Sequence, residues 1–454
     1  MSVLMKPLFS EPKADDYLNA ALKTAEWLRS AAIETEHGTF WPEDPASPDK
    51  PPLLGNFSLY SGMPGVILFF LQLAQTTGDE SYLTDAVNGG KYLINNWNDG
   101  KDIILDMGVE GSEWGPINGQ AGPAFVLAEL GIYTKNQEFL SFSEKLFNNI
   151  AEAAKEVNGL ITWTGESGGI SYDPGIALYL LYGANIFNNQ KWKTLVLNVG
   201  KSLVHKAKQL ENDAVRWDTI TVGNIGIDDG GEMPNFFYGT AGTAYALAKL
   251  YEEFGDQEFL DLAKAGGKYV ESICFTDGDN ALTPFCLPNP ESIYFIGMCN
   301  GFSGTVRLFY ELWKTTREEK YADFLERMVK GILNAGAPEV HFKGYWNVVC
   351  MCCGTSGLIN VFDGLYAATG NEKCLKLSKR VGRYLLGQFT DIGDGKGCWY
   401  QSWHRLSPWI IDAKIGYYDG NSGEAIQILE LYSAATGNFH TIRLPDDPYP
   451  NHLK

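Results

Sequence analysis

Residues 62–74 read GMPGVILFFLQLA, a Gly-x-x-Gly step followed directly by an apolar run. The same pattern recurs six more times, at residues 119–130, 172–184, 239–251, 301–313, 354–366 and 420–432. Only the third copy, YDPGIALYLLYGA, lacks its leading glycine. Successive closing glycines lie from 53 residues (Gly122 to Gly175) to 67 residues (Gly175 to Gly242) apart, enough for two helices and a loop. The chain is therefore a series of seven repeats.

Between these copies lies a second, more polar set of helical stretches. Their apolar residues recur at three- and four-residue spacing, whereas the runs after the glycines are apolar almost all round. The polar stretches begin at Asp15, Glu80, Gln137, Gln190, Gln257, Glu319 and Glu372. A helix that is apolar on all sides must be covered on all sides. The pattern thus predicts an all-α fold, an (α/α)7 toroid of two concentric layers with about fourteen helices.

Composition favours a single domain over residues 1–454, with a C-terminal tail at about 441–454. No Pro- or Ser-rich linker interrupts the periodicity, and 45% of the residues are hydrophobic. No apolar run reaches the roughly 18 residues of a membrane span, and the N-terminus lacks a signal-peptide pattern. We therefore expect a cytoplasmic protein. A net charge of −19 disfavours nucleic acid as a partner.

Three of the eight cysteines occupy a special place in the repeats. Cys299 lies two residues before a leading glycine, and Cys352 and Cys353 directly precede the next one. In a toroid these inner-helix starts converge at one end of the central cavity, so three thiols there predict a zinc site with one open position, typical of a catalytic zinc. Chance placement beside tight glycine turns is the alternative. The remaining cysteines are interpreted as inert buried thiols: Cys274, Cys286, Cys350, Cys374 and Cys398.

The two cysteine-bearing segments, GMCNGFSGTVRLFYELW and NVVCMCCGTSGLINVFDGLY, together with the seven glycine steps, resemble the lanthionine synthetase cyclase family, the LanC-like proteins. The resemblance covers essentially the whole chain. It implies a seven-fold α/α barrel and a zinc ion held by one Cys in the fifth repeat and a Cys-His pair in the sixth. Cys353 stands where the family usually has His, so the implied ligands are Cys299, Cys352 and Cys353, as in members with Cys-Cys-Gly.

The resemblance also implies a reaction. A cysteine thiol adds to dehydroalanine or dehydrobutyrine in a peptide and closes a thioether (lanthionine) ring. Zinc activates the substrate thiol, and an acid then protonates the α-carbon of the enolate. The implied partners are a dehydrated precursor peptide that contains cysteine and, separately, a dehydratase.

The acid–base residues are where this chain departs from the family. Tyr238 replaces a His found in many members just before the fourth glycine step, and Phe295 replaces an Arg in the fifth repeat. Tyr238 can donate a proton but is a poor base near pH 7. His404, in WYQSWHRLSP, is an alternative donor, although a surface or core role also fits it. The acidic residue expected before the third glycine step has two candidates, Glu166 and Asp173.

Other functions remain open from the sequence alone. Addition of a small thiol such as glutathione to dehydrated residues would use the same site. A zinc-bearing peptide-binding protein without turnover fits the Tyr238 and Phe295 replacements. A glycan-processing toroid enzyme needs two carboxylates across the cavity, for which Asp173 and Asp419 are the few candidates. Short aromatic segments before several steps either grip a peptide or plug the ring: residues 40–44 (FWPED) and those ending at Trp163, Trp217, Trp346 and Trp399.

Overall fold

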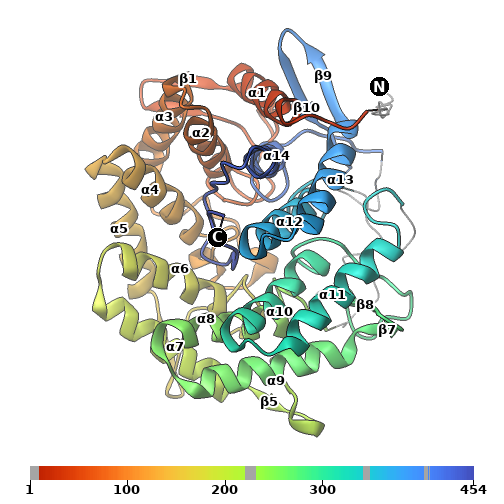
Figure 1. Cartoon of the computed structure of the whole chain (residues 1–454). Helices are drawn as coiled ribbons and strands as arrows, with labels where there is room; N and C mark the ends of the chain where they lie inside the picture. Colours follow the sequence, from red (N-terminus) through yellow and green to blue (C-terminus); the bar gives the residue numbers. More distant parts are fainter. Residues whose placement is uncertain (1–9, 220–231, 341–347, 403–406, 408, 454) are drawn as a thin grey trace.

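The computed structural model describes residues 10–219, 232–340, 348–402, 407 and 409–453. Within these ranges the chain forms fourteen α-helices in two concentric rings (Figure 1). The inner ring consists of α2 Met63–Thr77, α4 Ala121–Thr134, α6 Asp173–Ile186, α8 Thr240–Phe254, α10 Phe302–Thr316, α12 Ser356–Thr369 and α14 Asn421–Thr436. The outer ring consists of α1 Ala14–Ala31, α3 Glu80–Asn96, α5 Gln137–Glu152, α7 Gln190–His205, α9 Gln257–Ile273, α11 Glu319–Asn334 and α13 Glu372–Gln388. The all-α toroid predicted from the repeats is confirmed.

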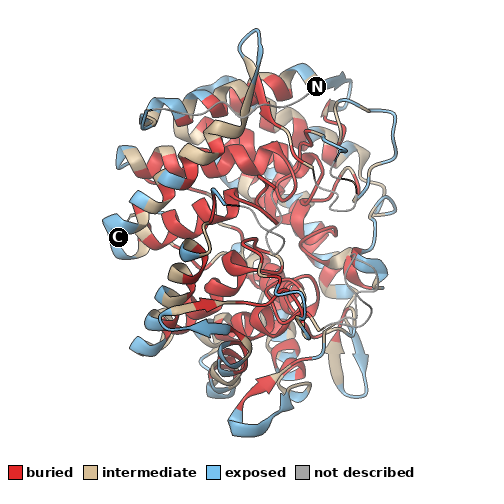
Figure 2. Cartoon of the chain, turned by 90° about the vertical axis from the view of Figure 1, so that its right-hand side faces the viewer, coloured by how far each residue is buried: buried red, intermediate tan, exposed pale blue. Residues whose placement is uncertain are grey.

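The inner ring is closed, and burial distinguishes its helices from the outer ones. Each inner helix packs against the next along the chain, and α14 packs against α2. Every residue of α2 from Met63 to Ala74 is buried, whereas α3 buries only a stripe that includes Tyr82, Ala86 and Leu93. This difference explains why one set of helices is apolar all round and the other only on one face. Across the molecule, buried residues fill the interior and exposed residues lie at the periphery (Figure 2). No helix in the described ranges combines the length and apolarity needed to cross a membrane.

Side-chain caps set where most outer helices begin. The residue before the helix accepts a hydrogen bond from the backbone N–H two positions further on, over 2.8 to 3.1 Å. The caps are Asp79, Asn136, Asn189, Asp256 and Asn371, which precede α3, α5, α7, α9 and α13. Such a cap stabilises a helix by about 1 kcal/mol. The polar starts read from the sequence are therefore the first residues of six of the seven outer helices, and α1 begins one residue before its predicted start.

Five short β-hairpins in the described ranges follow outer helices and return the chain toward the inner ring. They are β1 Ile33–Thr35 with β2 Gly38–Phe40, β3 Lys155–Val157 with β4 Leu160–Thr162, β5 Lys208–Gln209 with β6 Val215–Arg216, β7 Phe275–Asp277 with β8 Asn280–Leu282, and β9 Phe389–Gly393 with β10 Lys396–Trp399. The sequence did not predict them. Strands this short carry too few residues to show a two-residue alternation.

A buried tryptophan stands at the end of four of these hairpins. Each indole N–H donates a hydrogen bond to a carbonyl near the end of the preceding outer helix, over 2.7 to 2.9 Å. The pairs are Trp41 with Leu28, Trp163 with Ile150, Trp217 with Leu203, and Trp399 with Leu385. All four rings are at most 2% exposed, so they tie the layers together and are not available to grip a peptide. Trp346 lies outside the described residues.

The C-terminal tail enters the bore of the inner ring. Figure 1 shows the C-terminus near the centre of the ring, beside α12 and α14. The backbone N–H of Ile442 donates to Gln72 on α2 (2.8 Å), and the Tyr179 hydroxyl on α6 donates to the Asp446 carboxylate (3.2 Å). Arg307 on α10 donates to the backbone carbonyl of Asp446 (3.0 Å). Because one segment contacts helices around the ring, the tail fills the bore.

Candidate metal centre and active site

Three cysteine thiols meet at the starts of two neighbouring inner helices. The Cys353 sulfur lies 3.4 Å from that of Cys299 and 3.5 Å from that of Cys352, and all three sulfurs lie within 4.8 Å of one another. A tetrahedral zinc with bonds of about 2.3 Å needs sulfurs about 3.8 Å apart. The three thiols therefore fit one zinc ion with small adjustments, and they leave its fourth position for another ligand.

Backbone hydrogen bonds between neighbouring loops hold these thiols in place. The N–H groups of Met298 and Cys299 both donate to the Cys352 carbonyl (2.6 and 3.2 Å), and the Cys352 N–H donates to the Tyr418 carbonyl (2.8 Å). The same kind of bond joins further loops around the ring: Tyr418 N–H to Tyr60 (3.0 Å), Tyr60 to Ile117 (3.2 Å), Phe237 to Cys299 (3.0 Å) and Ser171 to Phe237 (2.9 Å). The sulfur positions are thus set by rigid backbone rather than by free loops.

The leading glycines are required because each of these loops folds back onto its own backbone. A Cβ on Gly301 would lie 2.2 Å from the Phe295 carbonyl oxygen, and one on Gly354 would lie 2.0 Å from that of Val348. In the third repeat Tyr172 takes the place of the leading glycine, and its buried ring lies 6.0 Å from that of Tyr238. The one departure from the glycine pattern therefore brings a side chain to the site.

The thiols of Cys352 and Cys353 resist ionisation in the absence of a cation. Hydrogen bonding with Cys299, Cys350 and Cys352 raises the pKa of Cys353, and burial raises that of Cys352. A divalent cation would reverse this preference because it stabilises thiolates directly. The donor set is therefore consistent with a metal site.

Cys350 lies on the same loop as Cys352 and Cys353, and the sequence interpretation set it apart as an inert thiol. It is completely buried, its carbonyl accepts the Gly354 N–H over 3.0 Å, and it contributes to the raised pKa of the Cys353 thiol. The signal for it was present in the sequence, since Cys350 and Cys353 have the C-x-x-C spacing.

Tyr238 lies on the loop next to that of Cys299, since the N–H of its neighbour Phe237 donates to the Cys299 carbonyl. The structure pairs Tyr238 with a carboxylate that sequence analysis missed. The Tyr238 hydroxyl is 3.4 Å from the Asp106 carboxylate. Burial is the main cause that raises the pKa of Tyr238 well above 10, and the negative charge of Asp106 raises it further. Cys299 and Cys352 also act on it electrostatically. Asp106 begins a short 3-10 helix, Asp106–Gly108, in the loop between α3 and α4. It is 7% exposed, and burial raises its pKa to about 6.

The two positions directly before the glycine step of each repeat supply most of the residues at the site. The two residues before each leading position are Tyr60-Ser61, Ile117-Asn118, Ile170-Ser171, Phe237-Tyr238, Cys299-Asn300, Cys352-Cys353 and Tyr418-Asp419. The ring of Tyr418 lies 5.6 Å from those of both Tyr60 and Phe237. Burial is the main cause that raises the pKa of Tyr60, and electrostatic interaction with Cys352 raises it further. Aligning the repeats on their glycines would have revealed this ring from sequence. Asp106 belongs to no such register, so no repeat pattern pointed to it.

Asp173 and Glu166, the two acidic candidates of the third repeat, have different surroundings. Asp173 accepts hydrogen bonds from the Thr162 hydroxyl, from the backbone N–H groups of Trp163 (3.0 Å) and Thr164 (2.9 Å), and from the Thr164 hydroxyl (2.9 Å). These bonds tie the third hairpin to α6. Glu166 is partly buried, and burial raises its pKa.

In other repeats an uncharged residue at the same position, the first residue of the inner helix, makes the equivalent hydrogen bond to the hairpin. Thr240 accepts from the Trp217 N–H (3.1 Å), and Asn421 accepts from the Trp399 N–H (2.7 Å). Asp173 therefore occupies a repeated structural position. His404 lies outside the described residues. Phe295 packs against Phe285, with ring centroids 4.6 Å apart.

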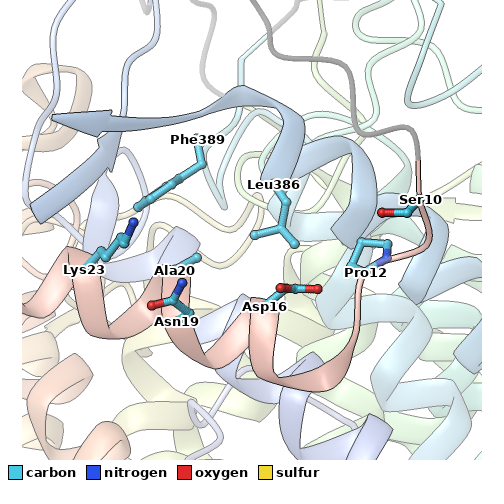
Figure 3. Close-up of a pocket in the computed structure, with 8 residues that line it drawn as sticks. All are labelled: Ser10, Pro12, Asp16, Asn19, Ala20, Lys23, Leu386 and Phe389. Carbon is cyan, nitrogen blue, oxygen red and sulfur yellow. The ribbon is translucent and has the colours of Figure 1, made fainter. Parts of the chain in front are cut away.

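A separate hollow of about 250 Å³ lies on the outer face of the protein, between α1 and the end of α13 (Figure 3). Lys23 and Phe389 form part of its wall. It includes none of the thiols or acid–base residues described above, so it is not part of the candidate site.

A seven-repeat α/α toroid with three thiols at adjacent inner-helix starts defines the class of protein. The chain belongs to the lanthionine synthetase C-like protein family, whose profile matches residues 53–444. This membership confirms the resemblance drawn from the glycine steps and cysteine segments. No curated protein shows significant sequence similarity to the chain.

The chain is also similar to solved structures. Nisin cyclase is similar over 92% of this chain and 94% of its own, with a TM-score of 0.62 and 16% identity. The cellobiose 2-epimerase of Bacillus thermoamylovorans B4167 covers 92% of this chain and 98% of its own, with a TM-score of 0.48 and 13% identity. D-mannose isomerase covers 72% and 88%, with a TM-score of 0.46 and 17% identity. The likeness to nisin cyclase supports the toroid over nearly the whole chain.

Proposed function

We propose that this protein is a zinc-dependent cyclase that adds a cysteine thiol to dehydroalanine or dehydrobutyrine within a peptide and so closes a thioether ring. The observation that carries the proposal is the cluster of three cysteine sulfurs within 4.8 Å, next to the loop that carries Tyr238. Membership of the lanthionine synthetase C-like family supports the same class of reaction.

Cys299, Cys352 and Cys353 would hold the metal. A bound zinc ion would accept the substrate thiol at its open position and lower the pKa of that thiol, so that it reacts as a thiolate near neutral pH. The three ligands come from rigid loops before α10 and α12. Such pre-organisation fixes where the substrate sulfur must lie relative to Tyr238.

Tyr238 is the proton donor in this proposal. The new bond forms between the substrate sulfur and the β-carbon of the alkene, and a proton must then reach the α-carbon. Tyr238 stays protonated at neutral pH, because burial and Asp106 raise its pKa. The 3.4 Å contact with Asp106 orients its hydroxyl. With a pKa raised to about 6, Asp106 can relay a proton from water back to Tyr238 after each turnover.

The two carboxylates considered for glycan processing, Asp173 and Asp419, give that alternative little support. Asp173 is held by its own hairpin. Asp419 accepts a hydrogen bond from Ser61 (2.6 Å) and lies 3.5 Å from the Lys414 ammonium. Both carboxylates therefore already have partners inside the protein. The partners expected for the cyclase are a dehydrated precursor peptide with a free cysteine and a separate enzyme that dehydrates its Ser and Thr residues.

The experiment is a thioether assay with a peptide that contains one dehydroalanine and one cysteine. We expect the peptide to lose its alkylatable thiol without a change in mass, only when the protein carries zinc. Glutathione supplied with a cysteine-free dehydrated peptide tests the small-thiol alternative, since its addition raises the mass by one glutathione. Peptide that binds the zinc-loaded protein but never loses its thiol would refute turnover and favour a binding protein.

A further inference from the structure

The C-terminal tail carries two histidines, His440 and His452, that have no role in the proposed reaction. They face each other across an antiparallel backbone bridge, and the N–H of Thr441 donates to the Asn451 carbonyl beside them over 3.2 Å. The two histidines are therefore a non-hydrogen-bonded antiparallel pair. In such a pair the side chains lie on the same face and at their closest approach. The centroids of the two imidazole rings are 5.0 Å apart.

This separation fits two imidazoles bound to one metal ion. A metal–nitrogen bond of about 2.0 to 2.1 Å places the metal about 3.2 Å from each ring centroid. Ligand angles of about 90° to 109° then place the two centroids about 4.5 to 5.2 Å apart. Burial lowers the pKa of His440, and the interaction with His452 lowers it further. The His440 ring is thus held in the neutral form that binds metal.

The histidine pair lies at the opposite end of the bore from the thiols. Asp419 directly precedes the glycine step at the start of α14, in the ring of loops that contains the thiols, and α14 ends at Thr436, four residues before His440. A helix of 16 residues is about 24 Å long. A metal ion on the histidines would therefore be separate from one on the cysteines.

The pair also closes the base of the segment that fills the bore, residues 441–451, which we call the tail loop. Asp446, near the middle of this loop, accepts a hydrogen bond from Tyr179 through its side chain and one from Arg307 through its backbone carbonyl. A bond between His440 and His452 through one ion would hold the two ends of the loop together.

We propose that His440 and His452 bind one divalent transition-metal ion, and that this ion clasps the base of the tail loop in the bore. Imidazole nitrogen suits Zn²⁺, Cu²⁺ and Ni²⁺. Two protein ligands leave the remaining positions of the ion to water, so the site binds more weakly than three thiolates do. It fills when metal is added and empties on dialysis. The site does not depend on the proposed cyclase function.

The test titrates Ni²⁺ into tag-free protein whose thiol site already carries zinc, with heat as the readout. Nickel is the probe because, unlike Cu²⁺, it does not oxidise thiols. We expect about one Ni²⁺ per wild-type chain, and at least about tenfold weaker binding in His452→Ala and in His440→Ala. His452 is exposed, so its removal leaves the packing of the tail intact. His37→Ala is the matched control, since His37 is an exposed histidine at the turn of the first hairpin.

Hydrogen exchange followed by mass spectrometry tests the clasp itself. At a nickel concentration about ten times the dissociation constant, exchange in residues 439–453 should slow about tenfold in the wild type and stay unchanged in His452→Ala. Equal nickel binding by the wild type and His452→Ala would overturn the site. Binding to the pair without slower exchange would overturn the clasp. The same titration of Cys352→Ala should still show the histidine site, and this result tests it even if the zinc assignment fails.

Discussion

The two ends of the central bore bury different kinds of polar group, namely thiols at one end and ion pairs at the other. At the inner-helix starts, thiols raise one another's pKa and fit an added cation. Around the C-terminal tail, the chain supplies its own cations. Arg443 donates to Glu430 (2.7 Å) and Asp447 (3.2 Å), and Arg307 donates to Asn360 (2.7 Å) and lies 3.9 Å from Asp447. The buried charges of the tail end therefore have partners within the chain, whereas the thiol end would depend on the proposed zinc ion. The two ends should respond differently to substitution and metal removal.

The largest effect is expected from Cys352→Ala, because a three-ligand zinc site cannot survive the loss of one ligand. Metal analysis should find about one zinc per wild-type chain and almost none in the variant, with thioether formation abolished. Cys374→Ala is the control, since Cys374 lies on the outer helix α13. A full zinc content in Cys352→Ala would refute the ligand assignment.

Arg307→Met should be the most destabilising change at the tail end. The side chain is 1% exposed, and its removal leaves Asp447 and the Asp446 carbonyl with fewer partners in the bore. Losing one partner of a buried ion pair costs about 3 to 5 kcal/mol. Denaturant unfolding measures this loss, while the zinc content of the folded protein should not change. The control is Arg380→Met, which removes an exposed pair with Glu339 and should cost less than about 1 kcal/mol. Equal losses in the two variants would contradict the comparison.

Tyr238→Phe separates proton donation from metal binding at the thiol end. The ring and its packing stay, and only the hydroxyl that meets Asp106 is removed. Zinc content should be unchanged, while thioether formation slows by on the order of 10²-fold. Mass spectrometry after thiol alkylation follows the reaction. Asp106→Asn should slow it less, because the hydroxyl remains. If Tyr238→Phe reacts at the wild-type rate and His404→Ala does not, the donor is His404.

The pH dependence of stability tests the buried carboxyl of the tail. Burial raises the pKa of Asp446 to about 6, above the value of about 4 expected in the unfolded chain. Its contribution to stability is therefore full below pH 4 and is lost as the pH rises through 6. Asp446→Asn cannot ionise, so its unfolding free energy should fall less between pH 4 and 6.5, by on the order of 1 to 3 kcal/mol. Denaturant unfolding at both pH values gives the difference, and parallel curves would disprove the buried titration.

Removing the metal should have the smallest effect on the fold. The inner helices pack against one another and on the outer ring, independently of the thiols. Circular dichroism after chelation should therefore show nearly unchanged helical content, together with loss of thioether formation. A collapse of the helical signal, as in domains that fold around zinc, would show that the metal is structural.

The sequence predicted well those features that repeat. The start of α8, the thiols of Cys299, Cys352 and Cys353, and the position of Tyr238 all follow from spacing relative to the glycine steps. The short hairpins were missed because their strands are shorter than the period needed to recognise them. The tail appeared only as a C-terminal extension, since nothing in its composition reveals that it fills the bore.

What the sequence determined by itself is the number and kind of helices, because local periodicity and capping are written in neighbouring residues. It also placed three cysteines at equivalent points of adjacent repeats. Only the tertiary structure decided which distant residues contact one another. It set Asp106 against Tyr238, 132 positions away, joined Asp173 to the hairpin before α6 by hydrogen bonds, and brought the Cys299 sulfur within 3.4 Å of that of Cys353. Such contacts depend on how the ring closes, and closure is a property of all seven repeats together.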